Sequence, residues 1–303
     1  MIVPGLLLLF LRAFPLTAQP VEEGWKQING VRLYYKMIGS GEPILVVHGG
    51  PGLEHSYFLP QMEDLARTHR LIFFDHRGHG KSDIPGDTTA MGITNFVNDI
   101  EELRKEFNLG TMNLMGHSWG GLVAMWYAVT YPHNLKSLLL INSTSPRSED
   151  RIIGMAEVSK RTTRQDSVDR AAILRSEDFR ARKAEAFERL FRINFRALLA
   201  DRRFADSLRL RFPPDYAVRN RVLQYLRKDL DSYDLTNDLR LIDVPTLILH
   251  GDSDPTPVEI SRSLQSHIHG STLVILERAG HFPFVEQPTA FRTAIDTFLN
   301  SLE

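Results

Sequence analysis

Short apolar runs alternate with helix-like segments along most of this chain, and that alternation restricts the fold more than any other feature. The runs PILVVHG (43–49), RLIFFDHRG (70–78) and TMNLMG (111–116) are nearly continuous, as expected for strands buried on both faces. Helical periodicity lies between them, at residues 94–107 and 122–132. Strands separated by helices join through parallel crossovers, so the pattern predicts a mostly parallel sheet in an α/β fold.

One long segment interrupts the alternation. Further strands are predicted at 31–39, 135–143, 244–251 and 271–277, and a closing helix at 288–301. Between the second and third of these strands, residues 147–234 show helical periodicity and hold 21 basic and 15 acidic residues, whereas the rest of the chain has an acidic excess. This segment is therefore predicted to be a helical insertion that forms a separate unit.

The heptapeptide MGHSWGG (115–121) places a serine in a turn between a predicted strand and a predicted helix. GHSWG satisfies the G-x-S-x-G pattern in the context that the pattern requires. Glycines at 116 and 120 let neighbouring backbone pass close to the strained serine. The sequence predicts that Ser118 is a nucleophile and that His117 supports the turn. The Trp119 N–H would point from a helix N-terminus toward developing negative charge.

A serine nucleophile needs a base to remove its proton, and the base is expected to be a histidine held by a carboxylate. The stretch ERAGHFPFVEQP (277–288) supplies His281 between the last predicted strand and the last helix. LILHGDSDPTP (247–257) offers Asp252 and Asp254 just after a strand. The resulting order of serine, aspartate and histidine is the order found in α/β hydrolases.

A second glycine-rich motif, HGGPG (48–52), follows the predicted strand PILVV. Its glycines let backbone N–H groups approach a substrate closely. The N–H groups of Gly50 and Trp119 are therefore the predicted pair of oxyanion donors.

Three motifs together carry a family resemblance. From about residue 24 to 301 the chain resembles the α/β-hydrolase fold, with a helical cap inserted after the sixth strand. HGGPG, DHRGHGKS (75–82) and GHSWGG resemble the proline iminopeptidase branch, which typically reads HGGPG, D-x-R-G-x-G-x-S and G-x-S-W-G-G. Family members end the acid strand with G-x-x-D, so the resemblance favours Asp254 over Asp252. The implied division is a core at 24–145 and 241–301 and a helical cap at 146–240.

The resemblance implies a serine hydrolase that works through an acyl-enzyme, and an aminopeptidase acting on short peptides is the first hypothesis. An esterase or a carbon–carbon-bond hydrolase remains open, as does a slow-turnover sensor of small molecules, because the fold alone does not give the function. Haloalkane dehalogenases and epoxide hydrolases are disfavoured because they need an aspartate at the position of Ser118. Amine-binding residues cannot be assigned among the cap acids, which include Glu185, Glu188, Asp201 and Asp206. Most of these acids have arginine at helical spacing and can pair with it. A basic cap fits acidic substrates about as well as substrates with a free amino group.

Composition excludes several other classes. The 36 basic residues are balanced by 37 acidic ones, so no nucleic-acid partner is predicted. The chain has no cysteine, which excludes disulfides, thiolate catalysis and cysteine metal sites. No histidine-containing stretch has convincing ligand spacing. No metal or cofactor is therefore predicted, and the expected partner is a small-molecule or short-peptide substrate.

The N-terminal stretch GLLLLFLRAFPLTAQP (5–20) has an apolar run of about the length of a signal h-region, too short to span a membrane. LTA before Gln19 resembles a cleavage site. Residues 1–18 are therefore predicted to be a signal peptide cleaved after Ala18, with export to the periplasm or the medium and no stable membrane span. No lysine or arginine precedes the apolar run, which leaves a hydrophobic extension on a cytoplasmic protein as the alternative.

Overall fold

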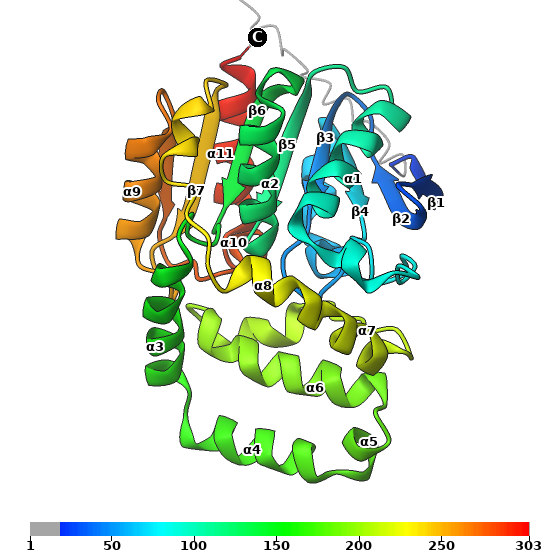
Figure 1. Cartoon of the computed structure of the whole chain (residues 1–303). Coiled ribbons are helices and arrows are strands. Elements are labelled where there is room, and N and C mark those ends of the chain that lie inside the picture. Colours follow the sequence, from blue (N-terminus) through cyan, green and yellow to red (C-terminus); the bar gives the residue numbers. More distant parts are fainter. Residues whose placement is uncertain (1–18, 303) are drawn as a thin grey trace, which may run out of the picture.

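A computed structural model describes residues 19–302, and one eight-stranded sheet forms its centre (Figure 1). The strand order is β1-β2-β4-β3-β5-β6-β7-β8. β2 is antiparallel to β1 and to β4, and the other neighbouring strands are parallel. The α/β class and the mostly parallel sheet predicted from the sequence are therefore confirmed. The strands are β1 (Val21–Ile28), β2 (Val31–Ile38), β3 (Glu42–Val47), β4 (His69–Phe74), β5 (Met112–His117), β6 (Leu135–Ile141), β7 (Thr246–Gly251) and β8 (Thr272–Leu276).

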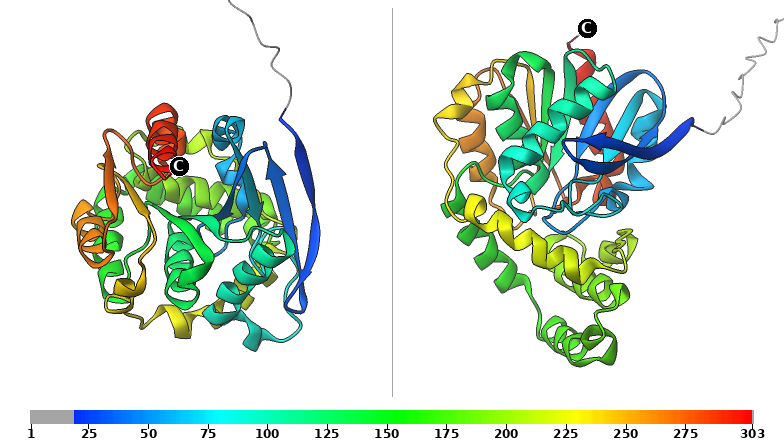
Figure 2. Two further views of the ribbon diagram at one scale, coloured as in Figure 1. Left: turned by 90° about the horizontal axis from the view of Figure 1, so that it is seen from above. Right: turned by 45° about the vertical axis from the view of Figure 1, so that its right-hand side comes forward.

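The central strands have a core on each face, which explains their continuous apolar sequence. In β3, Leu45 and Val47 point into one core, while Ile44 and Val46 point into the other. The first core is completed by α1 (Ile93–Glu106), α2 (Trp119–Thr130) and α9 (Val258–His267), and the second by α10 (Pro283–Glu286) and α11 (Pro288–Asn300). Seen from above, α11 lies across the sheet from α1 and α2 (Figure 2).

The edge strand β1 and helix α9 are among the elements that have no counterpart in the sequence-based predictions. The edge strand β1 reads VEEGWKQI, which is mostly polar and exposed, so it carries little hydrophobic signal. It pairs with β2 along its whole length, from Val21 opposite Ile38 to Ile28 opposite Val31. Helix α9 buries only Ser261 and Leu264. Both elements are stabilised by contacts with the rest of the fold, which a local pattern does not reveal.

Six α-helices lie between β6 and β7, where the sequence predicts a helical insertion. They gather beyond one end of the sheet, and α8 leads the chain back toward it (Figure 1). Short 3-10 turns connect several of them. The helices are α3 (Arg151–Arg161), α4 (Arg164–Arg175), α5 (Glu177–Arg180), α6 (Ala184–Phe195), α7 (Tyr216–Val222) and α8 (Arg227–Leu230). We call this group of helices and its connections the cap.

The predicted signal peptide at residues 1–18, with its cleavage after Ala18, lies outside the described residues. Among residues 19–302, no helix combines the length and the apolar character needed to cross a bilayer.

Candidate active site

Ser118 occupies a sharp turn between β5 and α2. Its backbone has φ 56° and ψ −124°, a conformation that costs free energy for any residue with a Cβ. The glycines on either side make the turn possible. A Cβ on Gly116 would clash with the carbonyl oxygen of Gly120, and one on Gly120 would clash with the backbone of Val47. The sequence GHSWG therefore forms a strained strand-to-helix turn, with Ser118 immediately before the first residue of α2.

Three of the predicted site residues meet in the structure. The Ser118 hydroxyl donates to His281 Nε2 over 2.8 Å, and His281 Nδ1 donates to Asp254 Oδ2 over 2.7 Å. Ser118 follows β5, Asp254 follows β7 and His281 follows β8. These are parallel strands, so their carboxyl ends lie along the same edge of the sheet. The arrangement can pass a proton from the serine to the histidine while the aspartate holds the ring.

The environment of Asp254 suits a carboxylate that stays ionised. Its Oδ1 accepts the Thr256 N–H over 2.7 Å, and its Oδ2 also accepts the side-chain amide of Asn142 over 2.6 Å. Burial alone would raise the pKa of Asp254, but the charge of the His281 ring and its hydrogen bond outweigh burial and lower the pKa to about 2. Asp252, the alternative acid, is exposed and accepts a hydrogen bond from Ser253.

Asn142 was not singled out by the sequence analysis. Its side-chain amide donates both to Asp254 and to the carbonyl oxygen of Gly280 over 3.1 Å, so it joins the loops that carry the acid and the histidine. The available signal was a polar residue at the end of the apolar strand LKSLLLINS.

The two predicted oxyanion donors lie on the loops that flank Ser118. Trp119 is the first residue of α2, so its N–H has no acceptor one turn earlier in the helix. Gly50 lines the same cavity as Ser118. The neighbouring Gly49 N–H is already used, because it donates to the Tyr57 hydroxyl over 2.7 Å. Within the HGGPG loop, this leaves Gly50 as the donor predicted to face a substrate.

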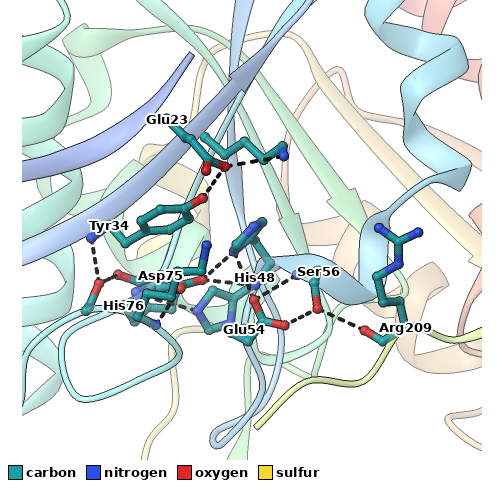
Figure 3. Close-up of polar contacts among 12 residues, drawn as sticks. Glu23, Tyr34, His48, Glu54, Ser56, Asp75, His76 and Arg209 are labelled. Atoms are coloured by element: carbon teal, nitrogen blue, oxygen red, sulfur yellow. Dashed lines mark hydrogen bonds and ion pairs between the residues drawn. The ribbon is translucent and has the colours of Figure 1, made fainter. Parts of the chain in front are cut away.

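A buried charged network supports the loop that follows HGGPG (Figure 3). The His55 ring lies 2.7 Å from Asp75 and 3.0 Å from Glu54, measured from Nδ1 to the carboxylate oxygens. Burial by itself would lower the pKa of His55, but the two carboxylates outweigh it and raise the pKa to about 10. Figure 3 also shows the links from Tyr34 to Glu23 and from Ser56 to the carbonyl oxygen of Arg209 in the cap.

Glu54, His55 and Asp75 also form the one cluster of potential metal ligands in residues 19–302. Their side chains are at most 8% exposed. The His55 proton lies between the carboxylates where a cation would have to sit, and Asp75 further accepts the backbone N–H groups of His55 and Lys81. The contacts therefore describe a charged histidine shared by two carboxylates, with the imidazole hydrogen in the place that a cation would take.

Two cavities reach His281. The smaller, about 160 Å³, contains Ser118 and the HGGPG loop, and α6 of the cap covers it with Phe191 and Phe195. The larger, about 800 Å³, lies between α3 and α4 of the cap and the ends of β6 and β7. Both cavities include His281 in their walls, and only the smaller one includes Ser118.

The candidate cap acids do not line either cavity. Glu188 pairs with Arg192 at 3.1 Å and Asp201 with Arg203 at 2.6 Å, both on the surface. Asp206 borders a separate cavity of about 400 Å³, and Glu185 borders none of these cavities. Instead, the carboxylate in the wall of the larger cavity is Asp150, which sequence reasoning did not identify.

Comparisons with known proteins show which family and fold the chain is similar to. A family model described as the alpha/beta hydrolase fold matches residues 42–288. The chain is 30% identical over 298 residues to a proline iminopeptidase of Saccharolobus solfataricus, covering 93% of each chain. It is 26% identical to a proline iminopeptidase of Clostridioides difficile, covering 93% of this chain and 99% of the relative.

Solved structures show the same fold at lower sequence identity. A proline iminopeptidase-related protein from Thermus thermophilus superposes with a TM-score of 0.70 at 21% identity, covering 93% of this chain and 98% of the other. An esterase from Exiguobacterium antarcticum gives a TM-score of 0.67 at 23% identity, covering 91% and 98%.

Proposed function

The chain belongs to the α/β hydrolase fold family and is a proline iminopeptidase-like member of it, and we propose that it is a serine aminopeptidase that acts on short peptides. The observation that carries the proposed chemistry is the hydrogen-bonded series Ser118, His281 and Asp254, with distances of 2.8 and 2.7 Å. The substrate class rests on the relatives, which are named proline iminopeptidases and match this chain over nearly their full length.

In the proposed mechanism, Ser118 Oγ attacks the carbonyl carbon of the scissile amide while His281 Nε2 takes the serine proton. The N–H groups of Gly50 and Trp119 bind the oxyanion of the tetrahedral intermediate. His281 then gives its proton to the departing amine, which leaves an acyl ester on Ser118. Water hydrolyses that ester by the same route, with His281 as the base, and restores the free serine.

An aminopeptidase must also hold the substrate ammonium group. Asp150 is the one carboxylate among the residues that line the two cavities at His281. Its side chain is 11% exposed, and it accepts hydrogen bonds from Ser145 Oγ at 2.6 Å and from Arg147 at 2.8 Å. We propose that Asp150 binds the ammonium by a charge-assisted hydrogen bond in exchange for part of its contact with the exposed Arg147.

One observation favours a second function, an esterase. The wall of the 160 Å³ cavity holds glycines, apolar side chains, Ser118 and two histidines, and its described residues include no carboxylate. A neutral acyl group would fit such a wall without leaving a charge unpaired.

Matched substrates separate the two functions. Wild-type protein and Ser118→Ala would be assayed on prolyl-naphthylamide, N-acetylprolyl-naphthylamide and p-nitrophenyl esters. An aminopeptidase should lose about 10-fold or more in kcat/KM when the amine is acetylated, because the substrate can no longer form a charge-assisted hydrogen bond with the carboxylate. Equal rates on the free and acetylated amides would reject the aminopeptidase. Turnover of esters alone would support the esterase. No turnover of any substrate would favour the remaining hypothesis, a slow-turnover sensor of small molecules.

The role of Asp150 has its own test. Asp150→Asn should raise KM for the free-amine substrate by about 10-fold and leave the acetylated substrate nearly unaffected. Glu149→Gln is the matched control, since Glu149 is exposed in the same turn and lines neither cavity. An equal response of the two variants would remove Asp150 from the proposal.

A further inference from the structure

A chain of buried hydrogen bonds links the HGGPG loop to the loop that carries His281. The Gly49 N–H donates to the Tyr57 hydroxyl over 2.7 Å, and that hydroxyl contacts His117 Nδ1 at 2.8 Å. On the other side of the ring, His117 Nε2 lies 2.7 Å from the carbonyl oxygen of His281. Tyr57 and His117 are each 1% exposed, so water does not compete for these bonds.

The partners of the chain allow only one placement of its protons. A carbonyl oxygen can only accept, so His117 Nε2 carries a hydrogen and donates to His281. Burial lowers the pKa of His117 to about 3, so the ring is neutral and Nδ1 has no hydrogen. The Tyr57 hydroxyl must then donate to Nδ1, and its lone pair accepts the Gly49 N–H. Each hydrogen bond of the series therefore has one donor and one acceptor, and each runs in the direction from Gly49 to His281.

Close packing leaves little freedom at each end. A Cβ built on Gly49 would lie 3.0 Å from Ser118 Cβ and 3.1 Å from the Tyr57 hydroxyl oxygen, so this loop passes tightly against the serine. Aromatic rings surround the Tyr57 ring, with centroid separations of 4.3 Å to Phe58 and 6.0 Å to Phe284. The His281 loop is also tied to the cap, because the His281 N–H donates to the carbonyl oxygen of Leu198 over 2.9 Å.

We propose that Tyr57 and His117 are positioning residues that hold the oxyanion loop and His281 at a set distance on opposite sides of Ser118. The inference rests on the proposed serine hydrolase function. Neither side chain lies among the reacting groups. Their effect is to keep two groups in place while charge develops on the substrate: His281, and Gly50, which follows Gly49 in the chain. Interactions of this kind matter most in the transition state, where small displacements weaken oxyanion hydrogen bonds.

Tyr57→Phe removes the hydroxyl and keeps the ring, so it tests the connection with little change in packing. We expect kcat to fall by about 10- to 100-fold, the scale on which oxyanion geometry acts, and KM to change by less than about 3-fold. Tyr127→Phe is the matched control. Tyr127 is also fully buried, and its hydroxyl donates to Glu101 over 2.8 Å on α1, away from the site. It should lose comparable thermal stability while kcat stays within about 2-fold.

The ring of His117 gives a readout that does not depend on activity. In the wild-type protein, ¹⁵N chemical shifts should show a neutral ring with hydrogen on Nε2 and an Nδ1 that accepts a hydrogen bond. In Tyr57→Phe the Nδ1 resonance should move toward that of an unbonded nitrogen, and the His281 signals should shift as well. A charged ring, or hydrogen on Nδ1, would overturn the proposed chain.

The outcomes separate this inference from the proposed function. Labelling of wild-type Ser118 by an organophosphonate, together with turnover, tests the function itself. If labelling and turnover occur but Tyr57→Phe behaves like Tyr127→Phe in kcat, the positioning role is wrong and the hydrolase stands. If the wild-type protein neither labels nor turns over, the hydrolase fails and the positioning role fails with it, whatever the ring shifts show.

Discussion

One ion pair of the sheet core and one of the cap lie in opposite environments. In the core, Arg77 and Asp99 form an ion pair with side chains 1% and 0% exposed, and Asn29 donates a further hydrogen bond to Asp99. In the cap, the side chains of Lys183 and Asp178 pair at 2.9 Å while remaining 59% and 36% exposed. Removing one member of a buried pair leaves an uncompensated charge, whereas an exposed pair exchanges its partner for water.

The cap also leaves large apolar side chains in solvent. On α3, Ile152 is 72% and Met155 is 68% exposed, and Met155 lines the larger cavity. The core holds the motif residues and many of their buried hydrogen-bond partners. In the cap, residues of α3, α4 and α6 line the two cavities that reach His281. We therefore expect chemistry and stability to be sensitive to core substitutions, and substrate preference to be sensitive to cap substitutions.

The largest expected effect is in the core, at the serine turn. Ser118→Ala should lower kcat by about 10⁴-fold or more, because it removes the nucleophile while the oxyanion donors and the cavities remain. The variant should unfold at nearly the wild-type temperature, which circular dichroism would measure beside the activity assay. An active Ser118→Ala protein, with an organophosphonate attached to another serine, would contradict the assignment.

The next effect distinguishes the two candidate acids in one loop. Asp254→Asn should reduce kcat by about 10³- to 10⁴-fold, since the amide has one acceptor oxygen where the carboxylate uses two, and its NH2 group favours the wrong tautomer of His281. Asp252→Asn should stay within about 10-fold of wild type. Steady-state kinetics on a single substrate would compare them, and the opposite ranking would transfer the role to Asp252.

A stability effect is expected at the buried network beneath the HGGPG loop. His55→Gln removes the positive charge between Glu54 and Asp75, and we expect a loss of about 3 kcal/mol in the free energy of unfolding. Urea unfolding of both proteins at pH 7 would measure it. A change below about 0.5 kcal/mol would mean that the two carboxylates find other compensation.

The same network predicts a pH dependence with a definite sign. The pKa of His55 is raised from 6.5 to about 10 in the folded protein, so its contribution to stability is complete below about pH 6.5 and is lost as pH rises toward 10. The difference in unfolding free energy between wild type and His55→Gln should therefore shrink between pH 7 and pH 10. A difference that stays constant over this range would show that His55 is not the group that titrates.

The smallest effect is expected in the cap. Asp178→Asn breaks the surface contacts with Lys183 and Arg189, at 2.9 and 3.0 Å, whose members are all more than a third exposed. Solvent screens such pairs, so the melting temperature and kcat should be unchanged within experimental error. A clear loss of stability would mean that the cap depends on its surface ion pairs and would weaken the contrast with the core.

Much of the core could be predicted from local sequence. The continuous apolar runs place β3, β4 and β5 within a few residues, because a strand buried on both faces has no polar alternation. The turn at Ser118 is equally local, since the glycines that permit it are within two residues of the serine. His281 was predicted from its place after a strand, as was an acid at Asp252 or Asp254, and the family resemblance favoured Asp254. The structure brings His281 and Asp254 within hydrogen-bond distance of each other, and their catalytic roles are predictions.

Other features depend on contacts between residues far apart in the chain, and only the tertiary structure decided them. Tyr57 and His117 are 60 residues apart, and Asn142 reaches Asp254 across the whole cap insertion. Helical periodicity located the cap but did not show that Asp150, rather than Glu188 or Asp201, lines a cavity that reaches His281. A helix can pack against a core in several orientations, and the orientation determines which side chains enter the site. The sequence by itself indicated strands β2 to β8, the serine turn and the order of the candidate triad, whereas packing determined which polar groups support that triad and which line the cavities.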